Sequence, residues 1–211
     1  MVSTIRGLKW LSIDLTHQCN LNCSFCGKHI ENSDYVMSIE QVLDVIKYFL
    51  GYDSIRVSGG ESLTHPYFQE VMKMLIAAYG NVTIATNGLL IPDLKSSLFT
   101  QLHFLVSDYT GINDEILEEY SWWNNVEVLD VNIKDRDRDP NLKDEQLVTC
   151  YERCPYVQVR VIDGRVYGCC HAETVERVHG GDFGVPVGPD WMEELEELER
   201  WEACRHCWMG R

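Results

Sequence analysis

The chain has 211 residues, 45% of them hydrophobic, and a formal net charge of −15. This length supports one main hydrophobic core with a small appendage, and no apolar stretch is long enough to span a membrane. The acidic charge disfavours a nucleic-acid partner, because such binding depends on basic side chains that neutralise phosphates. We find no signal peptide, so we expect a cytoplasmic protein in which the grouped cysteines, among nine in the chain, bind metal rather than form disulfides.

Strands and helices alternate along most of the chain. Residues 38–50 have apolar side chains at helical spacing, and Ser38 with Gln41 forms a capping box at the start of this helix. Such alternation predicts a parallel sheet in which right-handed crossovers connect successive strands. We expect strands at 11–15, 54–58, 81–85, 102–106 and 126–133, and helices at 38–50, 65–76, 92–99 and 113–120.

Three cysteines follow the first predicted strand at the spacing C-x3-C-x2-C: Cys19, Cys23 and Cys26. Thiolates are the ligands that iron–sulfur clusters select, and three of them on one loop would hold three irons of a [4Fe-4S] cluster and leave the fourth iron open. A zinc site is the alternative, with His17 or His29 as the fourth ligand. Zinc fits this spacing less well, because its cysteines usually come in C-x2-C pairs.

The cysteine spacing, with the aromatic residue Phe25 before the last cysteine, resembles the signature of the radical S-adenosylmethionine (SAM) superfamily. The resemblance implies that the open iron binds the amino and carboxylate groups of SAM. It also implies that an electron from the cluster cleaves the sulfonium and releases a 5′-deoxyadenosyl radical. A flavodoxin- or ferredoxin-type protein would then be the reductant.

Further residues match the superfamily at the ends of predicted strands, where parallel sheets bind cofactors. Gly59-Gly60-Glu61 follows the second strand and resembles the motif that meets the amino group of SAM. Glycine suits this place because the backbone must approach the ligand without a Cβ atom. Polar residues after the third and fourth strands resemble positions that touch the ribose of SAM or the substrate, and each could equally cap a helix: Asn87, Ser107 and Asp108.

A second group of cysteines lies further along the chain: Cys154, Cys169, Cys204 and Cys207. Their arrangement is similar to the twitch module, the short form of the SPASM domain, in which four cysteines hold an auxiliary [4Fe-4S] cluster. Between the first two of them, Asp163-Gly164 separates β-rich runs and predicts a hairpin. A zinc ribbon is the alternative for this region, and Cys150 or Cys170 could replace one of the four ligands.

The predicted fold is a truncated α/β barrel of the radical SAM type, with about five parallel strands and a small C-terminal module made of a β-hairpin and a helix. We assign residues 1–134 to the partial barrel and residues 150–211 to the cluster module. The linker between them, residues 135–149, includes most of a charged run that ends at Pro140.

This layout resembles radical SAM dehydrogenases that oxidise a secondary alcohol of an aminocyclitol. We therefore expect an oxidoreductase that acts on a small molecule such as an amino sugar or cyclitol. One alternative is a maturase that modifies a ribosomal peptide, although only about ten residues precede the first strand, too few for a leader-peptide-binding domain. The other alternative is a zinc or iron–sulfur protein without enzymatic activity. Loss of a substrate proton would need a base, for which the candidates are His65, His103, Asp108 and His171.

Overall fold

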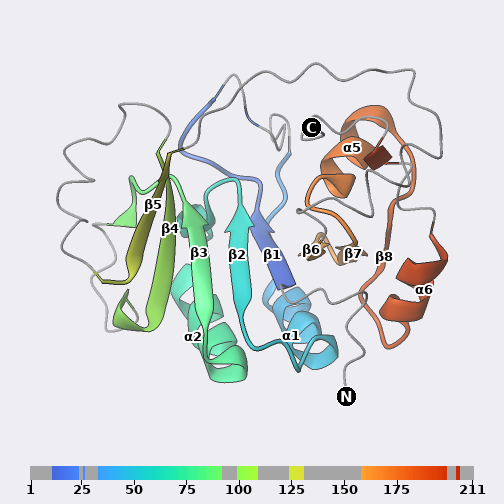
Figure 1. Ribbon diagram of the computed structural model, residues 1–211, viewed down its shortest axis with the longest axis horizontal. Coiled ribbons are helices and arrows are strands. Elements are labelled where there is room, and N and C mark those ends of the chain that lie inside the picture. Colours follow the sequence, from blue (N-terminus) through green and yellow to red (C-terminus); the bar gives the residue numbers. More distant parts are fainter. Residues whose placement is uncertain are drawn as a thin grey trace.

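The computed structural model describes residues 11–23, 26, 33–91, 99–108, 124–130, 158–198 and 203–204. Within these residues, one sheet has the strand order β5-β4-β3-β2-β1-β6-β7-β8 (Figure 1). The strands are β1 (Leu11–Thr16), β2 (Ile55–Gly59), β3 (Val82–Thr86), β4 (Leu102–Asp108), β5 (Val126–Asp130), β6 (Val159–Ile162), β7 (Arg165–Tyr167) and β8 (Gly184–Pro186). The helices are α1 (Ile39–Tyr48), α2 (Phe68–Tyr79), α5 (Ala172–His179) and α6 (Trp191–Glu197), with short 3-10 helices at η2 (Ser62–Thr64) and η4 (Phe99–Gln101).

The sheet is parallel through most of its width. Strands β1 to β5 pair in parallel with their sequence neighbours, and β6 pairs in parallel with the other edge of β1. Strands β7 and β8 then add antiparallel pairs. This open sheet confirms the predicted partial α/β barrel. Because β6 hydrogen-bonds directly to β1, the C-terminal hairpin lies beside the strand that leads into the first cysteine loop.

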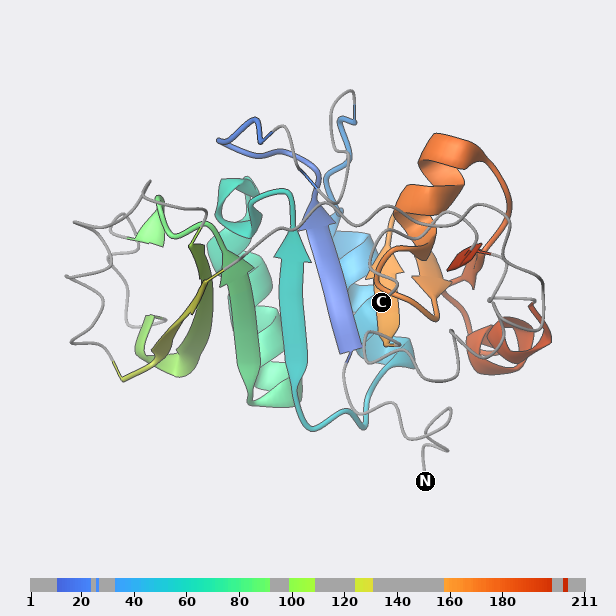
Figure 2. The ribbon, with the colours of Figure 1, turned by 45° about the horizontal axis from the view of Figure 1, so that its top comes forward.

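Helices α1 and α2 cover one face of the parallel strands (Figures 1 and 2). The predicted capping box begins α1: the Gln41 N–H donates to Ser38 Oγ at 3.2 Å, and the Ser38 N–H donates to Gln41 Oε1 at 2.8 Å. Apolar side chains from alternate strand positions meet those of the two helices in the main core, among them Ile13, Val57, Ile84, Val42, Val45 and Leu75. None of the described helices is long and apolar enough to cross a bilayer.

Helix α2 begins later than the sequence predicts. The 3-10 helix η2 precedes it, and the Tyr67 N–H donates to His65 Nδ1 at 3.2 Å, so the chain turns at residues 66–67 before α2 starts at Phe68. The predicted helix at 113–120 and the proposed linker at 135–149 lie outside the described residues, as does all but the last residue of the helix at 92–99.

The Asp163-Gly164 hairpin is confirmed. Asp163 has φ 49° and Gly164 has φ 69°, and two successive residues with positive φ are the requirement of the type I′ turn that joins tightly paired strands. Strands β6 and β7 pair across it, with Ile162 opposite Arg165.

The sheet face opposite α1 and α2 is polar. Side chains alternate between the two faces of a strand, so the residues between the core positions point to this second face. Across it, Asp14 of β1 lies opposite Ser58 of β2, and Ser12 lies between Arg56 of β2 and Arg160 of β6. The carboxyl ends of the parallel strands and this polar face together border the candidate site.

Candidate functional site

The first cysteine loop begins where β1 ends, at the carboxyl edge of the sheet (Figure 2). Cys19, Cys23 and Cys26 are all partly exposed and unpaired as thiols. The Leu21 N–H donates to Cys19 Sγ at 3.4 Å, and the Cys26 N–H donates to the Cys23 carbonyl at 3.1 Å. The chain therefore curls tightly and presents three sulfur atoms from one short loop.

The electrostatics of this loop favour binding of a positively charged metal centre. Burial raises the pKa of Cys19 above its ordinary value, and the neighbouring charges of Glu61, Cys23 and Cys26 raise it further. Burial also raises the pKa of Cys23, with Cys26 adding to the effect. Thiols that disfavour one another's charge lose their protons when metal binds, because the metal compensates the negative charge.

A site for a single metal ion needs a different geometry from a site for an iron–sulfur cluster. Within the described part of the chain, no three His, Cys, Asp or Glu side chains gather around a position that could hold one metal ion. An iron–sulfur cubane has a different requirement, since each thiolate binds its own iron corner. Three cysteines on one loop can supply three of the thiolate ligands that such a cluster takes.

The two glycines at the end of β2, Gly59 and Gly60, allow the chain to pack against the start of the cysteine loop. A Cβ atom at Gly59 would lie 2.3 Å from the carbonyl oxygen of Thr16, and one at Gly60 would lie 2.3 Å from that of Gln18. The Gly60 N–H donates to the Thr16 carbonyl at 2.6 Å, and the Glu61 N–H donates to the Gln18 carbonyl at 2.8 Å. The structure thus gives these glycines a second reason beside the predicted approach to SAM, namely close contact with residues 16–18.

Glu61 is fully buried, and its carboxylate joins η2 to the end of β3. It accepts hydrogen bonds from the Leu63 N–H at 3.1 Å, from Thr86 Oγ1 at 2.9 and 3.0 Å, and from the Asn87 N–H at 2.8 Å. Burial raises the pKa of Glu61, although these hydrogen bonds oppose the shift. The carboxylate therefore holds the ends of β2 and β3 together; its predicted contact with SAM stays a prediction.

Asn87 links the end of β3 to the cysteine loop. Its side-chain Nδ2 donates to Asn20 Oδ1 at 2.7 Å, and Asn20 lies between the first two cysteines of the loop. Ser107 is half-buried near the end of β4, and Asp108 is the last residue of that strand. Phe25 lies outside the described residues. The contacts of these residues with SAM or substrate also stay predictions.

The second cysteine group is partly described. Cys169 and Cys204 are buried in one small core cluster, and Cys170 packs against it. A hydrogen bond from the Cys170 side chain lowers the pKa of Cys169 to about 7 against the effect of burial, with help from backbone N–H groups at the start of α5 and from the charge of Arg160. Cys150, Cys154 and Cys207 lie outside the described residues, so the four-ligand twitch arrangement stays a prediction.

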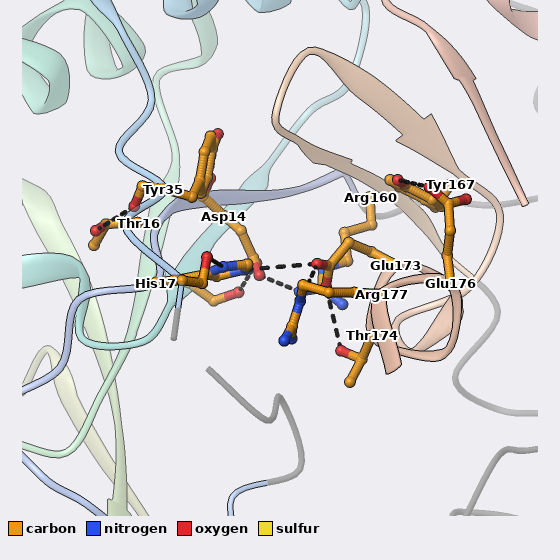
Figure 3. Close-up of polar contacts among 12 residues, drawn as sticks. Asp14, Thr16, His17, Tyr35, Arg160, Tyr167, Glu173, Thr174, Glu176 and Arg177 are labelled. Carbon is orange, nitrogen blue, oxygen red and sulfur yellow. Dashed lines mark hydrogen bonds and ion pairs between the residues drawn. The ribbon is translucent and has the colours of Figure 1, made fainter. Parts of the chain in front are cut away.

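A buried ion network joins the C-terminal hairpin to β1. Figure 3 shows Asp14, Arg160 and Glu173 pointing toward one another from β1, β6 and α5. The Arg160 guanidinium donates to the Asp14 carboxylate and to the Cys170 carbonyl, and lies 3.9 Å from Glu173. Ser58 Oγ donates to the other Asp14 oxygen at 2.5 Å. Removing one partner of a buried pair costs about 3–5 kcal/mol, because the other charge is left uncompensated.

His17 lies between this network and the cysteine loop. Its Nε2 is 3.9 Å from Glu173 Oε1, and its Nδ1 is hydrogen-bonded to Ser33 Oγ. Burial lowers the pKa of His17 below its ordinary value, although the charges of Glu173 and Asp14 oppose this. The ring also meets Tyr35 edge-on, with centroids 5.3 Å apart. The alternative role of His17 as a zinc ligand stays a prediction.

Sequence reasoning missed Asp14 and Arg160. Each is a single charge in an apolar strand segment, with Asp14 between Ile13 and Leu15, and Arg160 between two valines. Charged side chains are rarely buried unless they are paired, so each lone charge indicates a charged partner, but the sequence does not show which residue that partner is. Of the base candidates, His65 has a structural role: its ring is hydrogen-bonded to the Met37 carbonyl at 2.9 Å and accepts a hydrogen bond from the Tyr67 N–H.

Comparison with known proteins identifies the class. Residues 13–130, more than half of the chain, match the Radical SAM superfamily. The chain therefore belongs to this superfamily, whose members use a [4Fe-4S] cluster and SAM. The matched range includes all three cysteines of the first loop and the Gly-Gly-Glu segment.

Curated relatives match a shorter segment. A probable GTP 3′,8-cyclase of Saccharolobus islandicus is 38% identical over 97 residues, and a GTP 3′,8-cyclase of Alkaliphilus oremlandii is 32% identical over 101 residues. Each match covers 44% of this chain and 32% of the relative. The chain thus aligns with about a third of the length of these enzymes.

Two solved structures share the fold over nearly the whole chain. BtrN in complex with AdoMet and 2-DOIA has a TM-score of 0.64 at 15% identity, covering 96% of this chain and 88% of BtrN. The enzyme anSMEcpe with bound AdoMet and the Cp18Cys peptide has a TM-score of 0.54 at 16% identity, covering 92% and 81%. At these identities the likeness establishes a common fold.

Proposed function

We propose that this radical SAM enzyme oxidises a polar small molecule, such as an amino sugar or cyclitol, and that its C-terminal cysteines hold an auxiliary [4Fe-4S] cluster. The observation that supports this most is the burial of Cys169 and Cys204 in one cluster beside β1. When bound, the first cluster and SAM supply a 5′-deoxyadenosyl radical that removes a hydrogen atom from the substrate. A nearby second redox centre suits a net oxidation.

This chain's own residues have separable tasks in that proposal. Cys19, Cys23 and Cys26 would hold the first cluster. Gly60 and Glu61 hold this cysteine loop in place, because they make hydrogen bonds to the backbone of residues 16–18 and to the last residue of β3.

The polar sheet face supports a hydrophilic substrate. Arg56 and Thr83 on this face are only partly buried, and His103 is exposed. Register places them side by side, with Arg56 opposite Thr83 and Thr83 opposite His103. Hydroxyl and amino groups are recognised by such hydrogen-bonding side chains, whereas an apolar substrate would leave these polar groups without partners.

Iron analysis tests the two-cluster proposal. Anaerobic reconstitution should give about eight irons per chain, four for each cluster. Cys204→Ala should retain about four and still cleave SAM slowly, whereas Cys23→Ala should retain about four without cleaving SAM. Cys170 packs against the same hydrophobic core cluster as Cys169 and Cys204, and Cys170→Ala tests whether it replaces one of the four ligands: retention of about eight irons would leave Cys170 outside the ligand set. If Cys204→Ala also lost the iron of the first loop, the division into two sites would be wrong.

Substrate class is tested by isotope transfer. An aminocyclitol deuterated at its carbinol carbons should pass deuterium to 5′-deoxyadenosine and gain a carbonyl group. The main competing function is modification of a ribosomal peptide, for which the shared fold of the peptide-bound anSMEcpe structure is the supporting observation. Deuterium transfer from a labelled precursor peptide, with none from any aminocyclitol, would favour that function instead.

A further inference from the structure

Arg160 connects the two cysteine groups through one buried guanidinium. Its residue is 1% exposed, and it donates to the Asp14 carboxylate on β1 and to the Cys170 carbonyl ahead of α5. The loop with Cys19 begins shortly after Asp14 along the chain, and Cys169 directly precedes Cys170. A single side chain therefore sets the position of the second cysteine site relative to the strand that leads to the first.

Two acidic side chains lie beside the Arg160 guanidinium. Asp14 is fully buried beside it, and Glu173 lies 3.9 Å away. Glu173 is in turn bound by Arg177 Nε at 2.9 Å and faces the His17 ring. In a buried environment a fixed charge acts strongly on its neighbours, because little water screens it. The guanidinium bonds directly to the backbone of the second cysteine site at the Cys170 carbonyl.

We propose that Arg160 is a positioning residue that also tunes the second site: its buried positive charge raises the reduction potential of the iron–sulfur group held beside Cys169 and Cys170. This inference rests on the proposed auxiliary cluster. A cluster gains negative charge when it is reduced, and a fixed cation nearby stabilises that reduced form. Net charge and hydrogen bonding are among the factors that set cluster potentials.

A purely structural role makes a different prediction from an electrostatic one. If Arg160 only held the fold, removal of either Arg160 or Asp14 would shift the reduction potential of the second site in the same direction. If the charge of Arg160 acts on the cluster, the two substitutions shift the potential in opposite directions. Arg160→Met removes a cation and should lower the potential, whereas Asp14→Asn leaves the cation uncompensated and should raise it.

The experiment uses the full chain with Cys19, Cys23 and Cys26 replaced by Ala, so that only the second site binds iron. After anaerobic reconstitution, the potential is measured by redox titration with electron paramagnetic resonance. We expect Arg160→Met to reduce the ratio of reduced to oxidised cluster at least tenfold at a fixed potential, a shift of about 59 mV for one electron. Asp14→Asn should shift the potential the other way. Arg165→Met is the matched control, because Arg165 on β7 pairs with Asp182 at the surface.

Several results would overturn the inference. Shifts of the same sign in Arg160→Met and Asp14→Asn, or no shift in either, would show that the charge does not act on the cluster. If Arg160→Met fails to bind iron, Asp14→Asn and Arg160→Lys decide: the first should raise the potential and the second, which keeps the charge, should stay near wild type. No iron in the triple-alanine chain itself would overturn the proposed auxiliary cluster and this inference together, whereas iron with unmoved potentials would overturn the inference alone.

Discussion

Replacing Gly60 by Ala places a methyl group against the backbone that leads into the cysteine loop. The new Cβ atom would lie 2.3 Å from the carbonyl oxygen of Gln18 and 2.5 Å from that of His17. Ordinary contact begins at 3.4 Å, so the Gln18 carbonyl must move by about 1 Å. Both obstacles are main-chain atoms, and moving Gln18 also disturbs its 2.8 Å hydrogen bond from the Glu61 N–H. Overpacking of this kind costs about 1–3 kcal/mol.

The displacement reaches the proposed metal ligands because Cys19 follows Gln18 directly. An error of about 1 Å at a reactive centre can lower a rate by about 100-fold. We therefore expect Gly60→Ala to lose about 2 kcal/mol in the free energy of unfolding and about 100-fold in the rate of 5′-deoxyadenosine formation. Urea unfolding followed by circular dichroism measures the first, and anaerobic assays with SAM and dithionite measure the second.

Gly188→Ala provides the control for this prediction. Its Cβ atom would have no neighbour within 4 Å, and its stability should change by no more than about 0.5 kcal/mol. If Gly60→Ala were as stable and as active as Gly188→Ala, the close contact between the Gly-Gly-Glu segment and the cysteine loop would not determine the geometry of the site.

Three further predictions concern the fold. Burial raises the pKa of Glu61 in the folded state, so the folded protein holds this proton more tightly than the unfolded chain. The free energy of unfolding should therefore fall as pH rises above the ordinary pKa of 4.5. In urea titrations across the pH range, Glu61→Gln should remove this contribution to the pH dependence. Burial likewise raises the pKa of Tyr52 to about 12, so wild type should lose stability as pH rises above 10, and Tyr52→Phe should lose less. Ser38→Ala removes the cap of α1 and should cost about 1 kcal/mol in thermal unfolding, whereas Ser38→Gly should cost only a few tenths; no loss of stability in Ser38→Ala would mean that the N-cap residue does not stabilise α1.

Local signals in the sequence predicted much of the fold. The capping box at Ser38 and the positive-φ turn at Asp163-Gly164 depend on residues a few positions apart, and both are present. Alternating strands and helices also sufficed to predict the parallel sheet. The start of α2 was placed too early, because the histidine–backbone hydrogen bond that turns the chain at residues 66–67 leaves no periodic pattern.

Long-range pairing could not be read from the sequence. Asp14 and Arg160 are separated by 146 residues, and only the folded sheet shows that β6 pairs with β1 and brings them together. The glycines at 59 and 60 were predicted from their motif, but the backbone they contact became evident only from the arrangement of β1 and β2. The spacing of Cys19, Cys23 and Cys26 was informative because one short loop holds all three.

Formation of 5′-deoxyadenosine tests most directly whether Cys19, Cys23 and Cys26 hold the cluster that cleaves SAM. Anaerobically reconstituted protein, mixed with SAM and dithionite, should release this nucleoside, and Cys170→Ala should release it too. Cys23→Ala should release none. Wild-type protein that binds iron yet yields no nucleoside, or a Cys23→Ala protein as active as wild type, would contradict this assignment.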